Sequence, residues 1–492
     1  MSGLVHGWRA LAAASAVLVT GCVDLAPPYQ RPGAPTPASF PSGPAYPPAA
    51  AQQPVVGWRD FFSDPKLKAV IEQALANNRD LRVAVANIAA ARAQYHVQGA
   101  AEFPTVAAQA AATYAQQPAS VAGGGVSPGG SGTYNERLYS LTAGVSAYQL
   151  DLFGKVRDLT RAAQEQYFAT RAARDAAQIT LVSEVAADYL TIGSDQALLK
   201  IAQDTLASAT ESLAVTQHRF GAGIDSQLDI SQAETVVQQA RFDVARLTTQ
   251  VAQARNALDL VVGAPVDDGL LPGDVDQTVV VLDKLPEAVS SSVLLQRPDV
   301  LQAEDQLRAA NADIGAARAA FFPSISLTGS GGLTSLALST LFKGAAGTWT
   351  FAPAISQTIF DGGANRGNLA YAKAQRDVGV ANYEKAIQIA FREVADALAL
   401  RGTIDEQLAA QKALTAAAAD SLRLSAARYE RGSDTYLNVL IAQRTAYAAR
   451  QTLVAAQLSQ ATNLVTLYAV LGGGLDGPAS DSGMGAGRSG RR

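Results

Sequence analysis

Apolar residues recur every seven positions along two adjacent stretches of this 492-residue chain. The first series is Val185, Ile192, Leu199, Leu206, Leu213 and Phe220, and the second is Ile230, Val237, Val244, Val251 and Leu258. A strict seven-residue repeat makes helices pack side by side and supercoil left-handedly. The pattern therefore predicts two long helices, at residues 154–220 and 226–263.

A more polar version of the same pattern follows in the second half of the chain. It keeps apolar or aromatic residues at Val394, Leu408, Leu422, Tyr429, Val439, Leu453 and Leu467. It has Arg401, Thr415 and Gln460 at three positions where the first half is apolar. We predict long helices here too, at residues 362–431 and 435–471, with more polar contacts between them.

Four shorter segments alternate weakly between apolar and polar residues. They are residues 105–116, 138–150, 324–332 and 348–359, and a glycine-rich loop separates the first two. Segments of about ten residues with a period of two are typical of outer-membrane β-strands. A soluble β-sandwich is the alternative, but so few strands fit it poorly. The fold class is therefore mainly α with membrane β-strands.

The two halves also match residue by residue. Phe103-Pro104-Thr105 recurs as Phe322-Pro323-Ser324, and Arg219-Phe220-x-x-Gly223 recurs as Arg428-Tyr429-x-x-Gly432. Such self-similarity predicts two copies of one supersecondary unit, an internal two-fold repeat. The predicted copies are residues 55–263 and 297–472, each with a helix, two strands and two long helices, connected by residues 264–296. Residues 473–492, rich in Gly and Ser, are predicted to be a disordered tail.

The N-terminal residues have the features of an export signal. Residues 1–21 contain an apolar stretch after Arg9 that is too short to span a bilayer. Val19-Thr20-Gly21-Cys22 resembles the lipobox of bacterial lipoproteins, so we expect lipid on Cys22, with a plain secretory leader as the alternative. The residue after Cys22 is Val23, and an apolar residue at this position resembles lipoproteins that are sent to the outer membrane. Residues 22–54, rich in Pro and Ala, are predicted to be an extended, irregular tether.

Composition argues against several classes of function. The formal net charge of −4 gives no reason to expect nucleic acid as a partner. With one cysteine and three histidines we expect no metal site and no cofactor. His96 and His218 lie in separate helical segments, and residues 329–332 lack the lysine of a phosphate loop, so we do not expect an enzyme. Without a long apolar run, no transmembrane helix is expected.

Glycine and aspartate mark the turn between each pair of long helices. Gly221, Gly223 and Gly432 suit helix ends that need a positive φ. Asp225 and Asp434 then stand where an N-cap is expected. A capped αα-hairpin accounts for all of these residues.

Four strands are too few to close a barrel in a membrane. An open sheet edge in lipid would leave backbone groups unpaired. Several chains must therefore share one barrel, and three would provide twelve strands, a plausible even number. Helices of roughly 100 Å at 1.5 Å per residue are longer than a bilayer is thick and would project into the periplasm.

In these features the chain resembles the TolC-type outer-membrane factors, in the OprM/NodT-like lipoprotein branch of tripartite, RND-type efflux systems. The resemblance covers essentially the whole mature chain. Its marks are Cys22 followed by Leu25-Ala26-Pro27-Pro28-Tyr29, Asp64-Pro65-x-Leu67, Asp151-Leu152-Phe153-Gly154-Lys155, Arg297-Pro298-Asp299, residues 309–318 leading into Phe321-Phe322-Pro323, and Phe360-Asp361-Gly362-Gly363.

The resemblance implies a homotrimer with a twelve-stranded β-barrel in the outer membrane and a twelve-helix coiled-coil α-barrel in the periplasm. An equatorial belt would use residues 54–78 and 265–295 and the C-terminal region. The implied partners are a periplasmic adaptor protein, an inner-membrane RND-type transporter and outer-membrane lipid. The implied function is a passive exit duct for drugs, toxic solutes or metals. A secretion channel for proteins or peptides is the alternative, and a non-channel coiled-coil lipoprotein is a more distant one.

The resemblance also implies a gate at the periplasmic helix tips. Leu437 matches an apolar constriction residue, and Arg444 matches a basic residue beyond it. Ile441 and Asn438 stand where relatives have acids, so we expect a chiefly apolar closure, with Asp225 and Asp229 as other sources of negative charge. Because the second copy is more polar, we expect its hairpin to be the one that moves. The expected tip and adaptor contacts are Arg219, Phe220, Gly223, Arg428, Tyr429, Gly432 and Asp434.

Overall fold

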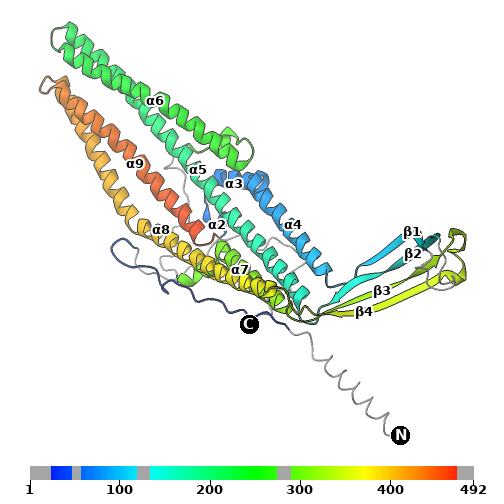
Figure 1. The fold of residues 1–492 in the computed structure, drawn as a ribbon. Coiled ribbons are helices and arrows are strands. Elements are labelled where there is room, and N and C mark those ends of the chain that lie inside the picture. The colour runs from blue at the N-terminus through cyan, green and yellow to red at the C-terminus, as the bar shows by residue number, and fades with distance from the viewer. Residues whose placement is uncertain (1–23, 47–56, 119–132, 274–289, 474–492) are drawn as a thin grey trace. The chain divides into compact units, whose positions relative to one another are not determined.

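The computed structural model describes residues 24–46, 57–118, 133–273 and 290–473, in two compact units (Figure 1). Unit 1 comprises Met1–Arg31, Ala89–Phe168 and Glu304–Ala381. Unit 2 comprises Pro32–Ile88, Ala169–Ala303 and Asn382–Arg492. Each unit contains parts of both predicted copies, so the compact units do not coincide with the sequence repeats.

Unit 1 contains a four-stranded antiparallel sheet in the order β1-β2-β3-β4. The strands are β1 (Val106–Pro118), β2 (Thr133–Leu150), β3 (Ser324–Ser335) and β4 (Gly347–Ser356). β3 is longer than predicted because its last residues pair with β2. β4 is shorter than predicted, since Ser356 pairs with Ser324 at the start of β3 and later residues have no strand opposite them.

Six longer helices carry the rest of the two units. They are α4 (Arg79–Ala100), α5 (Lys155–Gly221), α6 (Gln227–Val262), α7 (Pro298–Ala319), α8 (Ala364–Glu430) and α9 (Tyr436–Val470). The bounds of α5, α6, α8 and α9 agree closely with those predicted from the heptad pattern. In the described part of the chain, no helix combines the length and the apolar character needed to cross a membrane.

About half of the first copy's heptad positions are buried, and the others are partly buried apart from Phe220 at the tip, which is exposed. Val185 and Ile192 of α5 are fully buried, as is Leu258 of α6. Two of the three polar substitutions of the second copy make hydrogen bonds between α8 and α9, whereas Arg401 pairs with Asp405 within α8 at 2.9 Å. Gln460 donates to Asp405 at 2.8 Å, and Thr415 donates to the carbonyl of Ala449 at 3.2 Å. The polar contacts expected there are therefore present and paired.

A hydrophobic core in unit 2 lies where two short helices meet α5, α6 and α9. These helices are α2 (Trp58–Phe61) and α3 (Pro65–Asn77). Asp64 caps α3 by accepting from the backbone N–H of Lys66 at 2.8 Å, with proline at the first helical position. The buried members include Trp58, Phe61, Phe62, Leu67, Ile71, Val185, Tyr189, Ile192, Leu258, Val262 and Tyr468.

Arg297, from the motif before α7, joins three helices of unit 2. Its guanidinium pairs with Asp299 at 2.8 Å and with Glu393 of α8 at 2.8 Å. It also donates to the carbonyl of Val470, the last residue of α9, at 2.7 Å. The side chain is buried, so these charge-assisted bonds replace the water that it loses.

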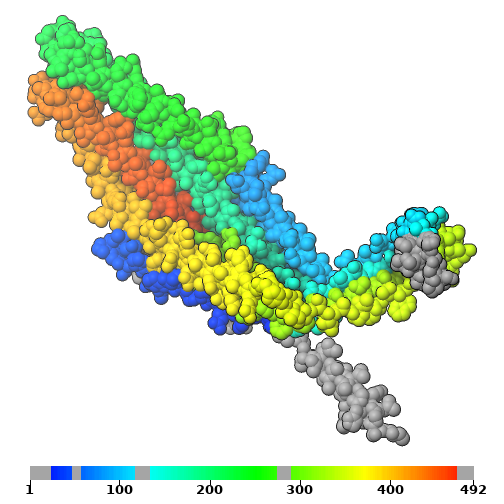
Figure 2. All heavy atoms as spheres, in the orientation of Figure 1, coloured from blue at the N-terminus to red at the C-terminus, as the bar shows by residue number. Residues whose placement is uncertain are grey.

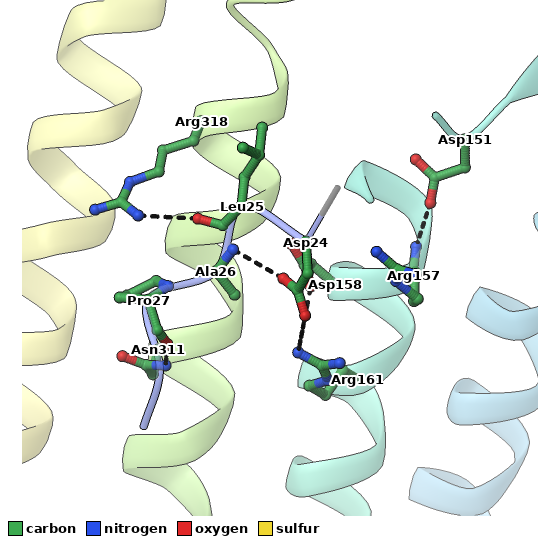
Figure 3. A network of polar contacts seen from close by, with 10 residues as sticks. All are labelled: Asp24, Leu25, Ala26, Pro27, Asp151, Arg157, Asp158, Arg161, Asn311 and Arg318. Carbon is green, nitrogen blue, oxygen red and sulfur yellow. Dashed lines mark hydrogen bonds and ion pairs between the residues drawn. The ribbon is translucent and has the colours of Figure 1, made fainter. Parts of the chain in front are cut away.

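The N-terminal segment, residues 24–31, is irregular as expected but is bound to α5 and α7 rather than loose (Figure 3). Arg161 donates to Asp24 at 2.9 Å. From α7, Arg318 donates to the carbonyl of Leu25 at 2.9 Å, and Asn311 donates to that of Pro27 at 2.7 Å. Two backbone carbonyls of this segment are therefore paired with helix side chains.

Asp158 lies beneath this segment with no exposed side-chain surface. Neither of its oxygens has a hydrogen-bond partner among the described residues, and Arg161 lies 3.6 Å away. Burial, together with the nearby charge of Asp24, raises the pKa of Asp158 to about 6. Gly315 of α7 makes room for the crossing, since a Cβ there would lie 2.0 Å from Asp158 Oδ2 and 2.7 Å from the nitrogen of Ala26.

Candidate functional site

The sheet of unit 1 has one apolar face and one polar face. Residues that pair directly across antiparallel strands point to the same side. A bulge between Val145 and Tyr148 shifts the pairing by one residue and keeps Tyr148 and Leu150 on the apolar face. That face carries Val106, Ala108, Ala110, Tyr114, Tyr139, Leu141, Val145, Leu327, Ile325, Trp349, Phe351 and Ile355, and it becomes polar at the start of β2, where Arg137 faces Tyr114 and Asn135 faces Gln116.

The opposite face carries small and polar side chains. It includes Gln109, Thr113, Ser140, Thr142, Thr328, Ser330, Thr348 and Thr350. On the apolar face, Trp349, Phe351 and Ile355 of β4 are all strongly exposed. A contiguous patch of exposed, large apolar side chains marks a surface that contacts lipid or another protein.

Both outer strands of the sheet have an unpaired edge. Among the described residues, β1 pairs only with β2, and β4 pairs only with β3. Free strand edges with apolar side chains are strong templates for pairing with another chain. The sheet is therefore incomplete as a single copy.

The first hairpin (α5–α6) and the second hairpin (α8–α9) of unit 2 end beside each other (Figure 2). Asp225, in the first tip, accepts a short hydrogen bond from the Tyr429 hydroxyl of α8. Arg219 of α5 donates to the same carboxylate at 3.0 Å and lies 4.5 Å from the centre of the Tyr429 ring. Asp225 is 7% exposed and therefore pairs within the chain.

A second contact of the same type joins the hairpins away from the tips. The hydroxyl of Tyr447 in α9 donates to Asp243 of α6 at 3.1 Å. Burial and the Asp243 carboxylate raise the pKa of Tyr447 to about 12, and burial with the Asp225 contact does the same for Tyr429. Both phenols stay protonated at neutral pH and can act as donors.

The prediction that Asp225 and Asp434 are N-caps is wrong. Ser226 caps α6 in a reciprocal capping box with Asp229, and Thr435 occupies the cap position of α9 without a side-chain bond. Asp225 is instead drawn to Arg219 and Tyr429. Asp434 accepts from Asn438 at 2.6 Å and pairs with Arg428 at 3.3 Å.

The predicted positive φ is found at two of the three glycines in the tips. Gly223 and Gly432 have φ of 77° and 73°, the left-handed region that glycine adopts without strain. Gly221 is not in that region, because it is still the last residue of α5.

The expected gate residues share one face of α9. Leu437, Ile441 and Arg444 follow helical spacing of four and three positions, which places them on one side. Leu437 is 49% exposed and Ile441 is 55% exposed. Arg444 is exposed and has no ion pair or hydrogen bond among the described residues. The carboxylate of Asp229 accepts hydrogen bonds from the backbone N–H and the hydroxyl of Ser226, at 2.9 and 2.6 Å.

The expected adaptor contacts divide into exposed and buried groups. Phe220 and Arg428 are exposed, whereas Tyr429 is buried against Tyr436 at a ring-centre distance of 5.4 Å. Arg219 is mostly covered by its own contacts. Phe220 and Arg428 are therefore the better candidates for contact with another protein.

Some expected features fall outside the described residues. Cys22, with the export signal, lies there, as do the glycine-rich loop between β1 and β2 and the C-terminal tail. Within the described ranges, no group of three or more His, Cys, Asp or Glu side chains is placed to hold a metal ion.

Sequence reasoning missed the pairing of Tyr447 with Asp243 and the fixed path of residues 24–31. Both depend on which helices become neighbours, which no local pattern states. One available signal was that Asp225 and Tyr429 are separated by the same number of residues as Asp243 and Tyr447, which fits two helix pairs running in register.

Comparisons with known proteins agree with this architecture. The family model described as "Outer membrane efflux protein" matches residues 70–264 and 289–473. Two relatives from Pseudomonas putida, the antibiotic efflux pump outer membrane protein ArpC and the toluene efflux pump outer membrane protein TtgC, are each 46% identical over 94% of both chains. The open-state Neisseria gonorrhoeae MtrE outer membrane channel is similar at a TM-score of 0.82 and 37% identity, over 92% of this chain and 98% of that one.

The family model matches two segments that together cover most of the chain, and the relatives align over nearly their whole length. Both comparisons indicate the same family. This chain belongs to the outer membrane efflux proteins of the TolC/OprM type and is an outer-membrane channel of an efflux system.

Proposed function

We propose that three copies of this chain form the passive exit duct of a tripartite efflux pump. The observation that carries the proposal is the sheet of unit 1, which has two unpaired edges, one apolar face and one polar face. Four strands from each of three chains would close a barrel of twelve. In that barrel β4 of one chain pairs with β1 of the next, and no edge remains in lipid.

The two faces of the sheet fit the two sides of such a barrel. Trp349, Phe351 and Ile355 would face lipid, and the threonine and serine face would line an aqueous lumen. β4 has 10 residues, which matches the roughly 9–11 residues that a tilted strand needs to span a bilayer. This alternation argues against a non-channel coiled-coil lipoprotein, which would have no use for it.

The long helices supply the periplasmic part of the proposed duct. α5 and α8 have 67 residues each, so they extend roughly 100 Å, about three times the thickness of the hydrocarbon core. With α6 and α9 they give four long helices from each chain and twelve around a three-chain barrel. The partners that fit a periplasmic tip are an adaptor protein and an RND-type inner-membrane transporter.

The tips form the proposed gate. Exposed Leu437 and Ile441 would meet their counterparts from the other chains and close the opening by apolar contact. The contacts Tyr429–Asp225 and Tyr447–Asp243 hold the second hairpin against the first. An adaptor that contacts Phe220 or Arg428 could shift this balance, with the second hairpin moving and the first remaining in place.

The side chains of the proposed lumen and the names of the relatives together indicate the class of cargo. A lining of small polar side chains discriminates little among solutes, so selection falls to the transporter. Relatives named for antibiotic and toluene efflux support cargo of drugs and toxic solutes. Lipid on Cys22 would anchor the chain in the same membrane.

Planar-bilayer recording of the purified chain tests the proposal. We expect discrete, stable conductance steps, because a closed barrel with a polar lumen carries ions. Replacing Trp349 and Phe351 by glutamate should abolish these steps by blocking insertion, whereas Thr348→Ser and Thr350→Ser on the opposite face should preserve them. A purified, folded chain that never conducts would refute the proposed function.

A further inference from the structure

A cavity of about 300 Å³ lies between the two hairpins of unit 2, beside the proposed gate. Its walls come from α5, α6 and α9, and Figure 2 shows α5 (teal) between α6 (green) and α9 (orange to red). Arg444 supplies a cationic group to the lining. Neutral polar groups come from Thr235, Gln239, Gln443 and Tyr447, and Val236 gives an apolar wall.

The positive charge of Arg444 is not balanced inside the cavity. The carboxylate bonded to the lining is that of Asp243, which accepts from Tyr447 at 3.1 Å and from Gln239 at 3.3 Å. Asp243 also lies 3.6 Å from Arg246, so its charge is already compensated. Arg444 itself has no ion pair or hydrogen bond within the described residues.

Three acids of the two tips are already paired, whereas Glu430, at the end of α8, is exposed and lies on a different helix from Arg444. Asp225 is paired with Arg219, and Asp434 is paired with Arg428. Ile441, one helical turn before Arg444 on α9, is apolar and offers no acid to it. The uncompensated charge on this face of α9 is therefore that of a guanidinium.

We propose that this cavity binds small organic anions, with aromatic carboxylates as the class that fits best. A guanidinium presents paired N–H donors that match the two oxygens of a carboxylate. The amides of Gln239 and Gln443 can hydrogen-bond a second polar substituent. Val236 offers an apolar surface for the ring, as in most small-molecule sites, where a few polar groups orient an otherwise apolar ligand.

The consequence for conduction rests on the proposed function. Arg444 follows Leu437 and Ile441 on one face of α9, so three copies would place three cations next to the constriction. The closed tip should then be blocked by anions and not by cations. Binding to the cavity itself requires only one chain.

The test uses benzene-1,3,5-tricarboxylate, a rigid trianion, and hexaamminecobalt(III), a trication of similar size. In planar bilayers the trianion should block the wild-type channel at a concentration at least about 10-fold below that of the trication. Arg444→Gln removes the guanidinium from all three chains and should raise the half-blocking concentration by at least roughly 30-fold, the loss expected from a single charge-assisted bidentate contact. Arg444→Lys should fall between the two, since it keeps the charge but not the paired donors.

Arg450→Gln is the matched control. Arg450 is also an exposed arginine of α9 without a partner among the described residues, but it does not line the cavity. It should leave the half-blocking concentration within about two-fold. Conducting channels that bind the trication more tightly, or that respond equally to both glutamine variants, would overturn the inference.

Calorimetric titration of the detergent-purified chain with the same trianion separates the two proposals. Saturable binding that Arg444→Gln weakens and Arg450→Gln does not would support the anion site even if no variant conducts. Absence of binding, in a chain that conducts normally, would sink the site and leave the channel intact.

Discussion

Tyr429→Phe should weaken the closed tip without altering its packing. The substitution removes the hydroxyl that donates to Asp225 and keeps the ring that packs on Tyr436. A hydrogen bond to a charged group contributes about 1.5–3 kcal/mol. Because Arg219 still pairs with Asp225 at 3.0 Å, the lower end of that range applies. Three chains acting on one gate would then lose roughly 4.5 kcal/mol, about two-thousand-fold in the ratio of closed to open channels.

Single-channel recording measures this ratio as open probability at fixed voltage. Tyr436→Phe is the control, because Tyr436 is equally buried and its hydroxyl makes no hydrogen bond among the described residues. Combining Tyr429→Phe with Asp225→Asn should add little to either change alone, since both remove one shared contact. Open probability that stays within two-fold of wild type for Tyr429→Phe, or that rises equally for Tyr436→Phe, would refute this account of the gate.

Three further substitutions test the packing that supports the duct. Burial raises the pKa of Asp158 to about 6 from 3.8, so the folded state binds its proton more tightly and stability falls as pH rises through that interval. Asp158→Asn should therefore increase the unfolding free energy at pH 8 by up to about 3 kcal/mol, seen as a higher melting temperature, and leave stability at pH 3 unchanged. An equal increase in stability at both pH values would contradict this prediction. Gly315→Ala should displace residues 24–31 and speed their hydrogen exchange, whereas Gly367→Ala, where a Cβ meets nothing within 4 Å, should not. Arg297→Lys should cost about 3 kcal/mol by leaving Glu393 and the end of α9 without their shared donor, and an unchanged melting temperature would argue against that role.

The helices and strands were largely predictable because their signals are local. A seven-residue apolar repeat and the absence of proline determine α5, α6, α8 and α9 over dozens of residues. The strand ends were less predictable, because they depend on the partner. β4 ends at Ser356 for want of a facing residue on β3, a fact that no property of β4 itself reveals.

The tips show where local reasoning fails. Asp225 and Ser226 are adjacent, and either has a side chain that can cap a helix. Asp225 instead accepts hydrogen bonds from Tyr429 and Arg219, so Ser226 is the residue that caps α6. The Arg444 cavity and the Asp243–Tyr447 contact arise in the same way, from the packing of α6 against α9.

The assembly is the central claim, and electron cryomicroscopy of the purified chain in lipid nanodiscs tests it most directly. We predict three chains around one axis, a closed barrel of twelve strands in which β4 of each chain pairs with β1 of the next, and Trp349 facing lipid. A particle with one or two chains, or a three-chain particle whose sheets stay separate with their edges unpaired, would contradict it.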